Sequence, residues 1–88
     1  MINNIRLNGI VKTEPILAYA NGIFKYGFFK LAVGGTSASP VAVSDIYCYK
    51  EEMLDGINKG NPVVVEGEVK EASFDVKAIS IIVGTPIG

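Results

Sequence analysis

Five segments of the chain alternate between apolar and polar residues, which is the pattern of half-buried β-strands. They span residues 3–12, 23–33, 41–49, 61–70 and 74–83. In the fourth segment, a Lys-Gly-Asn-Pro turn precedes Val63, Val64 and Val65, and three β-branched residues after a turn predict a strand with a deeply buried face. Gly67 lies inside this strand and predicts a bulge, a tight bend or a close backbone approach, as the corners of a small barrel require.

The alternation also predicts which side chains face the core. We expect the core to receive Phe29, Leu31 and Val33 from the second segment, Ile46 and Cys48 from the third, and Val63, Val65, Gly67 and Val69 from the fourth. The opposite face of the second segment carries Tyr26, Phe28 and Lys30, and that of the third carries Tyr47 and Tyr49. If these two strands are neighbours, the four rings share one outer face. In the last segment both faces are apolar towards the end, so the pattern leaves its orientation open.

The remaining segments are expected to connect these strands. Residues 16–20 are interpreted as a connector that ends at a turn signal, Asn21-Gly22. Residues 34–40, GGTSASP, have the composition of a flexible loop, and residues 84–88 form a short tail. Residues 50–58 contain the only helical pattern, in which Met53, Leu54 and Ile57 form one apolar stripe. We expect at most two turns of helix there, covering the open end of a barrel.

Five strands with one short helix between the third and the fourth form the order of an OB-fold. This is an all-β architecture, a five-stranded and partly open Greek-key barrel. The length of 88 residues fits one such domain, over residues 1–88.

The composition argues against an enzyme and against a bound metal or cofactor. The chain has no histidine, which removes the commonest general base and metal ligand. The single cysteine, Cys48, suits a reducing compartment and is expected to be a small core residue. The acidic side chains of residues 51, 52 and 55 have helical spacing, and the first two suit the first turn of a helix. No apolar run is long enough to span a membrane, and no signal peptide is evident, so we expect a cytoplasmic protein.

The charge of the chain makes a nucleic-acid role depend on local patterning. Eight basic and nine acidic residues give a net charge of −1, whereas proteins that bind phosphates usually carry a basic excess. The outer aromatics suggest a platform on which bases stack, although they could instead cover the core or a subunit interface. The basic residues suggest phosphate contacts, although they could instead be solvated strand faces. The nucleic-acid-binding residues that we predict are Arg6, Lys12, Lys25, Tyr26, Phe28, Lys30, Tyr47, Tyr49, Lys70, Phe74 and Lys77.

Several short motifs, in order along nearly the whole chain, resemble the single-stranded DNA-binding protein (SSB) family. NNIRLNGIVKTEPIL resembles the opening strand of that family, and Asn21-Gly22 matches the turn before its second strand. FFKLAV resembles the Phe-x-Leu-Ala-Val end of that strand, and KGNPVVVEGEV resembles the Lys-Gly-x-x-Val-x-Val-Glu-Gly-x-Leu block. Residues 79–83 resemble the closing strand. In size the chain is closer to the primosomal replication protein N branch, and a minimal phage-encoded form is an alternative.

The resemblance implies a protein that binds single-stranded DNA, largely without sequence preference, in DNA replication, recombination or repair. By position, Tyr49 corresponds to a family aromatic, Tyr47 lies on the same face, and Phe74 stands for an aromatic of the last hairpin. Two positions depart from the family pattern, because Val43 stands where many members carry Trp and Asp45 where Arg is frequent. The family also implies a homodimer or homotetramer, into which an outward Ile10 would fit, with replication or recombination proteins as further partners. RNA remains an alternative ligand, and a bacterial or phage-infected cell is the expected host.

An alternative function is kept open: an OB-fold module for protein–protein interaction or assembly that binds no nucleic acid. The net charge of −1, Asp45 and the short last hairpin favour it.

Overall fold

The computed structural model describes residues 4–35, 39–69 and 75–84 as six strands and one short helix. The strands are β1 (Asn4–Val11), β2 (Ile16–Ala20), β3 (Ile23–Val33), β4 (Ala42–Cys48), β5 (Pro62–Val69) and β6 (Asp75–Val83). The helix η1 (Glu51–Leu54) is a single 3-10 turn between β4 and β5. The five predicted strands are therefore present, each within a residue or two of its expected bounds, and β2 is additional.

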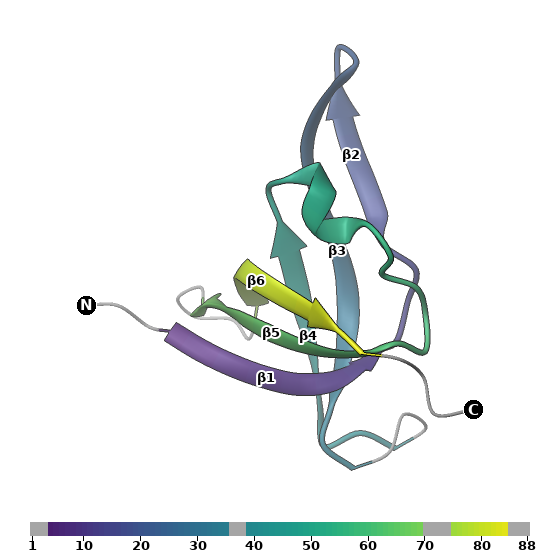
Figure 1. The fold of residues 1–88 in the computed structure, drawn as a ribbon, viewed down its shortest axis with the longest axis vertical. Coiled ribbons are helices and arrows are strands. Elements are labelled where there is room, and N and C mark those ends of the chain that lie inside the picture. Colours follow the sequence, from purple (N-terminus) through teal and green to yellow (C-terminus); the bar gives the residue numbers. More distant parts are fainter. Residues whose placement is uncertain (1–3, 36–38, 70–74, 85–88) are drawn as a thin grey trace.

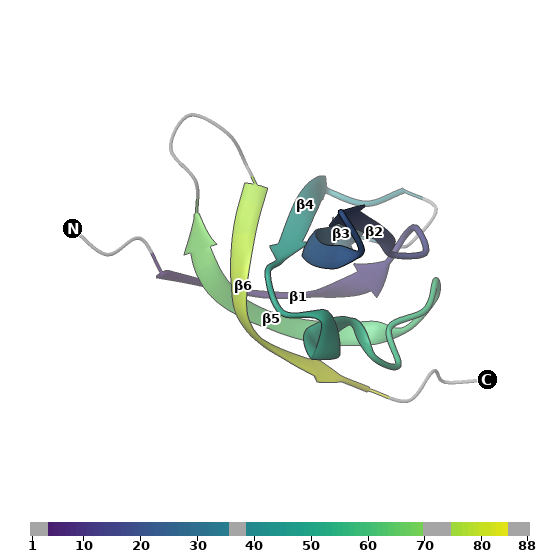
Figure 2. The ribbon, with the colours of Figure 1, turned by 90° about the horizontal axis from the view of Figure 1, so that it is seen from above.

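Five of the strands close into a barrel, which confirms the predicted OB-fold (Figures 1 and 2). They follow the order β1-β5-β6-β4-β3, and β3 then returns to β1 through pairs such as Gly9 with Val33 and Val11 with Leu31. The strands pair antiparallel except β4 with β6, whose parallel pairing joins the two halves of the barrel.

The interpretation of residues 16–20 as a connector is wrong. These residues form β2, which pairs with β3 from Ile16 opposite Phe28 to Ala20 opposite Ile23. The predicted turn joins the two strands, with Asn21 at φ 52° and Gly22 at φ 76°, the left-handed backbone that a tight hairpin requires. β2 pairs with no strand other than β3 in the described residues, and Figure 1 shows this hairpin extending beyond the barrel.

The predicted helix is a single 3-10 turn, within the limit of two turns expected, and it contacts the barrel as expected. Leu54 of η1 and Ile57, which follows it, are buried in the core, and η1 contacts β3 and β4. Leu54 packs directly on Gly27 of β3: a Cβ at residue 27 would lie 2.3 Å from the Leu54 Cδ1 atom. The glycine that the sequence places in mid-strand therefore makes room for the side chain that closes this end of the barrel.

The core is built largely from the predicted inward positions, although Val69, which was expected there, is half-buried and is not part of the core cluster. Phe29, Leu31, Ile46, Cys48 and Val65 are fully buried. Burial raises the pKa of the Cys48 thiol to about 11, because the charged thiolate is disfavoured in an apolar site. The prediction that Cys48 is a core residue is confirmed.

A bulge in β6 explains why its apolar pattern could not be assigned to one face. Gly67 of β5 lies opposite Ala78, whereas Glu66 lies opposite Ser80, so Ile79 is an extra residue in β6. Val76 and Ala78 face the core before the bulge, and Ile81 packs against the core after it. Gly67 permits this geometry, since a Cβ there would lie 2.2 Å from the carbonyl oxygen of Lys77. The prediction of a bulge or close approach at Gly67 is confirmed.

The expected loop and tail fall only partly within the described residues. Residues 36–38 of the predicted loop at 34–40 and residues 85–88 of the tail lie outside them. Gly84 continues from β6 and donates a backbone hydrogen bond of 2.7 Å to the carbonyl of Pro62. Among the helices of the described residues, none has the length and apolar character needed to cross a membrane.

Candidate nucleic-acid interface

The pairing of β3 with β4 brings four aromatic rings together on the outside of the barrel. Phe28 and Tyr47 are register partners, with ring centroids 5.5 Å apart and planes inclined by 29°. The centroid of the Tyr26 ring lies 6.4 Å from that of Phe28, 6.2 Å from that of Tyr47 and 6.4 Å from that of Tyr49. The four rings thus form one connected cluster, which we call the aromatic wall (Tyr26, Phe28, Tyr47 and Tyr49). The sequence-based expectation that they share a face is met.

The rings of the aromatic wall pack on one another more than on the core. Tyr26 and Tyr49 are 37% and 44% exposed, and Phe28 and Tyr47 are half-buried. Phe24 of β3 is partly buried and packs against the core cluster. Among the described side chains that do so, none belongs to the aromatic wall. Large exposed aromatic surfaces on a rigid sheet are suited to stacking with planar ligands.

A second bulge separates Phe24 from the aromatic wall. Tyr19 of β2 pairs with Phe24, but the preceding Ala18 pairs with Tyr26, which leaves Lys25 as the extra residue of β3. Because neighbouring residues of β2 point to opposite faces, Phe24 and Tyr26 also point to opposite faces. The Tyr19 hydroxyl hydrogen-bonds to the Glu51 carboxylate, and its ring meets Phe24 edge-on at 5.7 Å. Tyr19 and Phe24 therefore fasten the hairpin to η1, and the aromatic wall occupies the other face.

The row of residues through Phe28 extends across four strands. Ile16 of β2 lies opposite Phe28, Phe28 opposite Tyr47, and Tyr47 beside Lys77 of β6. Ile16 is 56% exposed and widens the apolar surface beside Phe28. The Lys77 ammonium lies 5.6 Å from the centroid of the Tyr49 ring, within cation–π range. Lys77 thereby sets a positive charge at the edge of the aromatic wall.

The next row of the same face is charged. Lys30, Asp45 and Asp75 follow one another across β3, β4 and β6. The Lys30 ammonium donates a 2.8 Å hydrogen bond to Oδ1 of Asp45, and this contact, followed by the charge of Asp45, raises the pKa of Lys30. The two side chains are 48% and 28% exposed. Asp45 therefore offsets much of the positive charge that Lys30 would otherwise offer to a phosphate.

The other predicted basic residues are more scattered. Lys12 follows β1 beside the charged row, since its backbone N–H donates to the carbonyl of Lys30 at 2.7 Å. Lys25 is exposed on the β2–β3 hairpin next to Tyr26. Arg6 lies on β1 and faces Glu66 of β5 at 3.8 Å, so the structure does not bring it to the aromatic wall. The predicted residues Lys70 and Phe74 lie outside the described residues.

The sequence pattern alone does not predict Ile16 as part of this surface, because the interpretation of residues 16–20 as a connector leaves it without a strand partner. The sequence does hold a signal for β2: ILAYA and IFKYG flank an Asn-Gly turn, which is the pattern of a two-residue hairpin.

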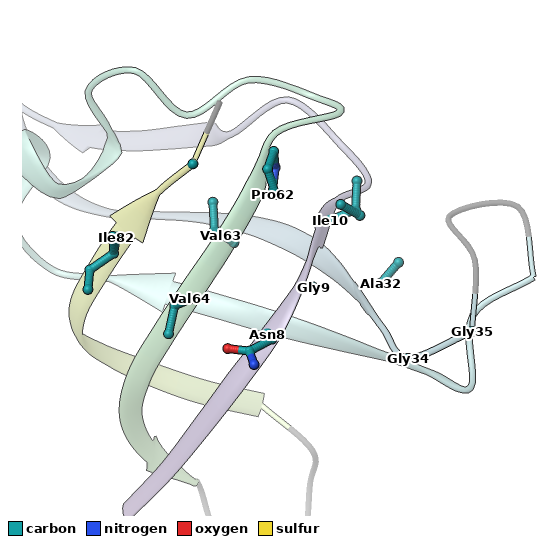
Figure 3. Close-up of a pocket in the computed structure, with 11 residues that line it drawn as sticks. Asn8, Gly9, Ile10, Ala32, Gly34, Gly35, Pro62, Val63, Val64 and Ile82 are labelled. Carbon is teal, nitrogen blue, oxygen red and sulfur yellow. The ribbon is translucent and has the colours of Figure 1, made fainter. Parts of the chain in front are cut away.

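A second apolar surface lies on β1, β5 and the second half of β6. We call it the aliphatic wall (Ile10, Val64, Ile79 and Ile82). Ile79 and Ile82 are each 59% exposed, and Ile10 and Val64 are half-buried. Three of these side chains line an open pocket near Gly34 and Gly35, in which Figure 3 shows Ile10, Val64 and Ile82 on three different strands. This surface carries no aromatic ring among its described residues.

The described residues were also compared with the ligand groups that metal ions require. No group of three or more Cys, Asp and Glu side chains there is placed to hold a metal ion.

Comparison with known proteins gives a likeness in structure alone. No family model and no curated protein matches the sequence. Among solved structures, a small single-stranded DNA-binding protein from Streptomyces coelicolor matches with a TM-score of 0.75 and 22% identity, over 96% of this chain and 93% of that one. The mitochondrial single-stranded DNA-binding protein of S. cerevisiae matches with a TM-score of 0.79 and 13% identity, over 98% of both chains.

A third match is the Plasmodium falciparum SSB in complex with single-stranded DNA, with a TM-score of 0.67 and 19% identity over 97% of both chains. The chain has the OB-fold of these three proteins. The resemblance inferred from sequence motifs therefore extends to the three-dimensional structure over nearly the whole length.

Proposed function

We propose that this chain binds single-stranded DNA, largely without sequence preference. The observation that carries the proposal is the aromatic wall, four rings connected in one cluster on the outside of an OB barrel. The three similar structures, which are single-stranded DNA-binding proteins, support it.

Bases would stack on the four rings, and each stacked base contributes roughly 1–3 kcal/mol in proteins of this kind. Lys77 and Lys25 flank the rings and would contact phosphates, as would Lys12 and Lys30 at the other margin. Asp45 and Asp75 lie within the same face, so the positive charge available to one subunit is small. We therefore expect a single subunit to bind weakly.

A homodimer or homotetramer would overcome this weakness, since linked sites gain by effective concentration. The aliphatic wall supports such an assembly, because two exposed isoleucines on a sheet face lose unfavourable contact with water when covered. The role that we propose is in DNA replication, recombination or repair, in the cytoplasm of a bacterium or a phage-infected cell, with RNA as an alternative ligand. The protein would act by binding its ligand, as a non-enzyme.

A second candidate is an OB-fold module that binds protein. The ion pair between Lys30 and Asp45 favours it, because a surface built to hold phosphates gains nothing from a carboxylate beside its lysine.

Fluorescence anisotropy with a labelled oligo-dT of about 30 nucleotides, which exceeds the site of one OB domain, distinguishes the two candidates. The DNA-binding proposal expects micromolar or tighter binding at low salt. It also expects log K to fall with log salt, with a slope of about −0.7 for each phosphate contacted. Absence of binding at low salt would reject DNA binding and favour the protein-interaction module.

A further inference from the structure

The charged row of the candidate interface lies directly beside the aromatic wall. Lys30 and Asp45 occupy the same strand faces as Phe28 and Tyr47, two residues along β3 and β4. Positions i and i+2 of a strand are roughly 6.5 Å apart, which is comparable with the width of a base. A base stacked on Phe28 or Tyr47 can therefore present its hydrogen-bonding edge to Lys30 and Asp45.

The ion pair itself leaves capacity for further hydrogen bonds. The Lys30 ammonium has three donors and gives one to Oδ1 of Asp45 at 2.8 Å. A carboxylate offers about four lone-pair positions, so the bond from Lys30 uses one of them. Both side chains are accessible, at 48% and 28% exposure. The pair thus presents a donor and an acceptor side by side, next to the stacking surface.

We propose that the Lys30–Asp45 pair makes the aromatic wall prefer guanine to thymine, an inference that rests on the proposed DNA binding. The edge of guanine carries an acceptor, O6, next to two donors, N1–H and the N2 amino group. Lys30 would donate to O6, and the carboxylate of Asp45 would accept from N1–H and N2–H as a bidentate, charge-assisted pair. Unstacked bases of single strands expose this edge.

The other bases fit the pair less well. Thymine has a single ring N–H between two carbonyl oxygens, and those oxygens face the carboxylate unfavourably. Cytosine and adenine each offer one amino group, so they should lie between guanine and thymine. Asp75, the register neighbour of Asp45 on the side away from Lys30, adds a second negative charge to the same row and further disfavours a second carbonyl oxygen, such as that of thymine, at this end.

Inosine provides the test, because it is guanine without the N2 amino group and keeps the purine stacking surface. The experiment measures the affinity of the full chain for labelled alternating (TG)n, (TI)n and oligo-dT strands, each of about 20 nucleotides, longer than one OB domain covers. Lithium buffer prevents guanine quadruplexes. The proposal expects (TG)n to bind about fivefold or more tightly than oligo-dT, and (TI)n to lose most of that gain.

The variant Asp45→Asn should remove the difference between (TG)n and (TI)n. Glu66→Gln is the matched control: it makes the same change in net charge, but on β5 opposite Arg6 and away from the aromatic wall, so it should keep the difference. Equal affinities of the wild-type chain for (TG)n and (TI)n would overturn the proposal without needing any variant. Retained binding to oligo-dT in that case would leave the proposed function standing, whereas failure of every strand to bind would reject both.

Discussion

The aromatic wall and the aliphatic wall, both formed by described residues on the outside of the barrel, differ in chemistry. The aromatic wall consists of rings that contact one another, with Lys77 against Tyr49 at one margin and the Lys30–Asp45 pair at another. The aliphatic wall consists of branched side chains, and two of them, Ile79 and Ile82, are more exposed than any ring of the aromatic wall. Rings with basic neighbours suit stacked bases and phosphates, whereas exposed isoleucines suit packing against another apolar surface.

Strand β6 borders the aromatic wall and contributes to the aliphatic wall, which shows how the two surfaces are kept separate. Its first half places Lys77 beside Tyr47, and its second half places Ile82 opposite Val64. The bulge at Ile79 lies between the two halves, and Gly67 of β5 makes the bulge possible. A list of exposed apolar residues does not separate these two surfaces. The strand pairing does, because it shows which exposed residues are neighbours.

Among the variants that distinguish the two walls, removal of two rings of the aromatic wall should have the largest effect on affinity for oligo-dT. The double variant Phe28→Ala and Tyr47→Ala removes the closest ring pair, so affinity for oligo-dT should fall by about 5- to 150-fold for each lost stacking partner. Anisotropy titration measures the loss, and circular dichroism checks the fold.

The matched control is the double variant Ile79→Ala and Ile82→Ala on the aliphatic wall. A single subunit of this variant should keep the stacking contacts, so its affinity per subunit should change little. If this control loses as much affinity per subunit as the ring variant, the assignment of DNA to the aromatic wall is wrong.

Gly67→Ala should destabilise the barrel where β5 packs against the bulge of β6, between the two walls. The new Cβ would lie 2.2 Å from a backbone oxygen of β6, which cannot move as a flexible side chain could. We expect the free energy of unfolding to drop by about 3 kcal/mol, at the upper end for overpacking. Urea denaturation measures it, and a variant as stable as the wild type would refute the role given to Gly67.

Asp45→Asn should increase affinity for oligo-dT severalfold, because Lys30 then becomes available to phosphate. The slope of log K against log salt should become steeper by about 0.7, the value for one additional phosphate contact on a single strand. Glu66→Gln, the control with the same change in net charge, should leave the slope unchanged. Equal effects of the two variants would mean that overall charge, and not the position of Asp45, governs binding.

Lys77→Gln should have a smaller effect in the opposite direction. The loss of the ammonium beside Tyr49 removes one phosphate contact, so the salt slope should become shallower by about 0.7. Arg6→Gln tests the other side of the comparison: because Arg6 lies opposite Glu66 on β1 and β5, we expect no change in slope. If the salt slope changes more in Arg6→Gln than in Lys77→Gln, the assignment of DNA to the aromatic wall is wrong.

Much of this architecture follows from local patterns in the sequence. Alternation sets which residues of a strand face outward, so the shared face of Phe28 and Tyr47 could be predicted once β3 and β4 were assumed to pair. Gly67 also had a local signal, since a glycine within a run of valines indicates a bulge or a close approach.

Features that depend on pairing between distant strands could not be predicted. The outward position of Arg6 follows from alternation, but which wall it joins depends on the order of strands around the barrel. The bulge at Ile79 reverses the faces of β6 partway, so a constant alternation fails there. Residues 16–20 are exposed on both faces along much of their length. Their sequence therefore lacks the apolar–polar alternation that identifies the other strands.

The most direct test of the account is a titration of the isotope-labelled protein with oligo-dT, followed by NMR of backbone amides and methyl groups. We predict that chemical shifts change first and most at the amides of Phe28, Tyr47 and Lys77, while the methyl groups of Val64 and Ile82 respond only to changes in assembly. Shifts concentrated on the aliphatic wall, with the aromatic wall unaffected, would contradict the assignment of the nucleic-acid interface.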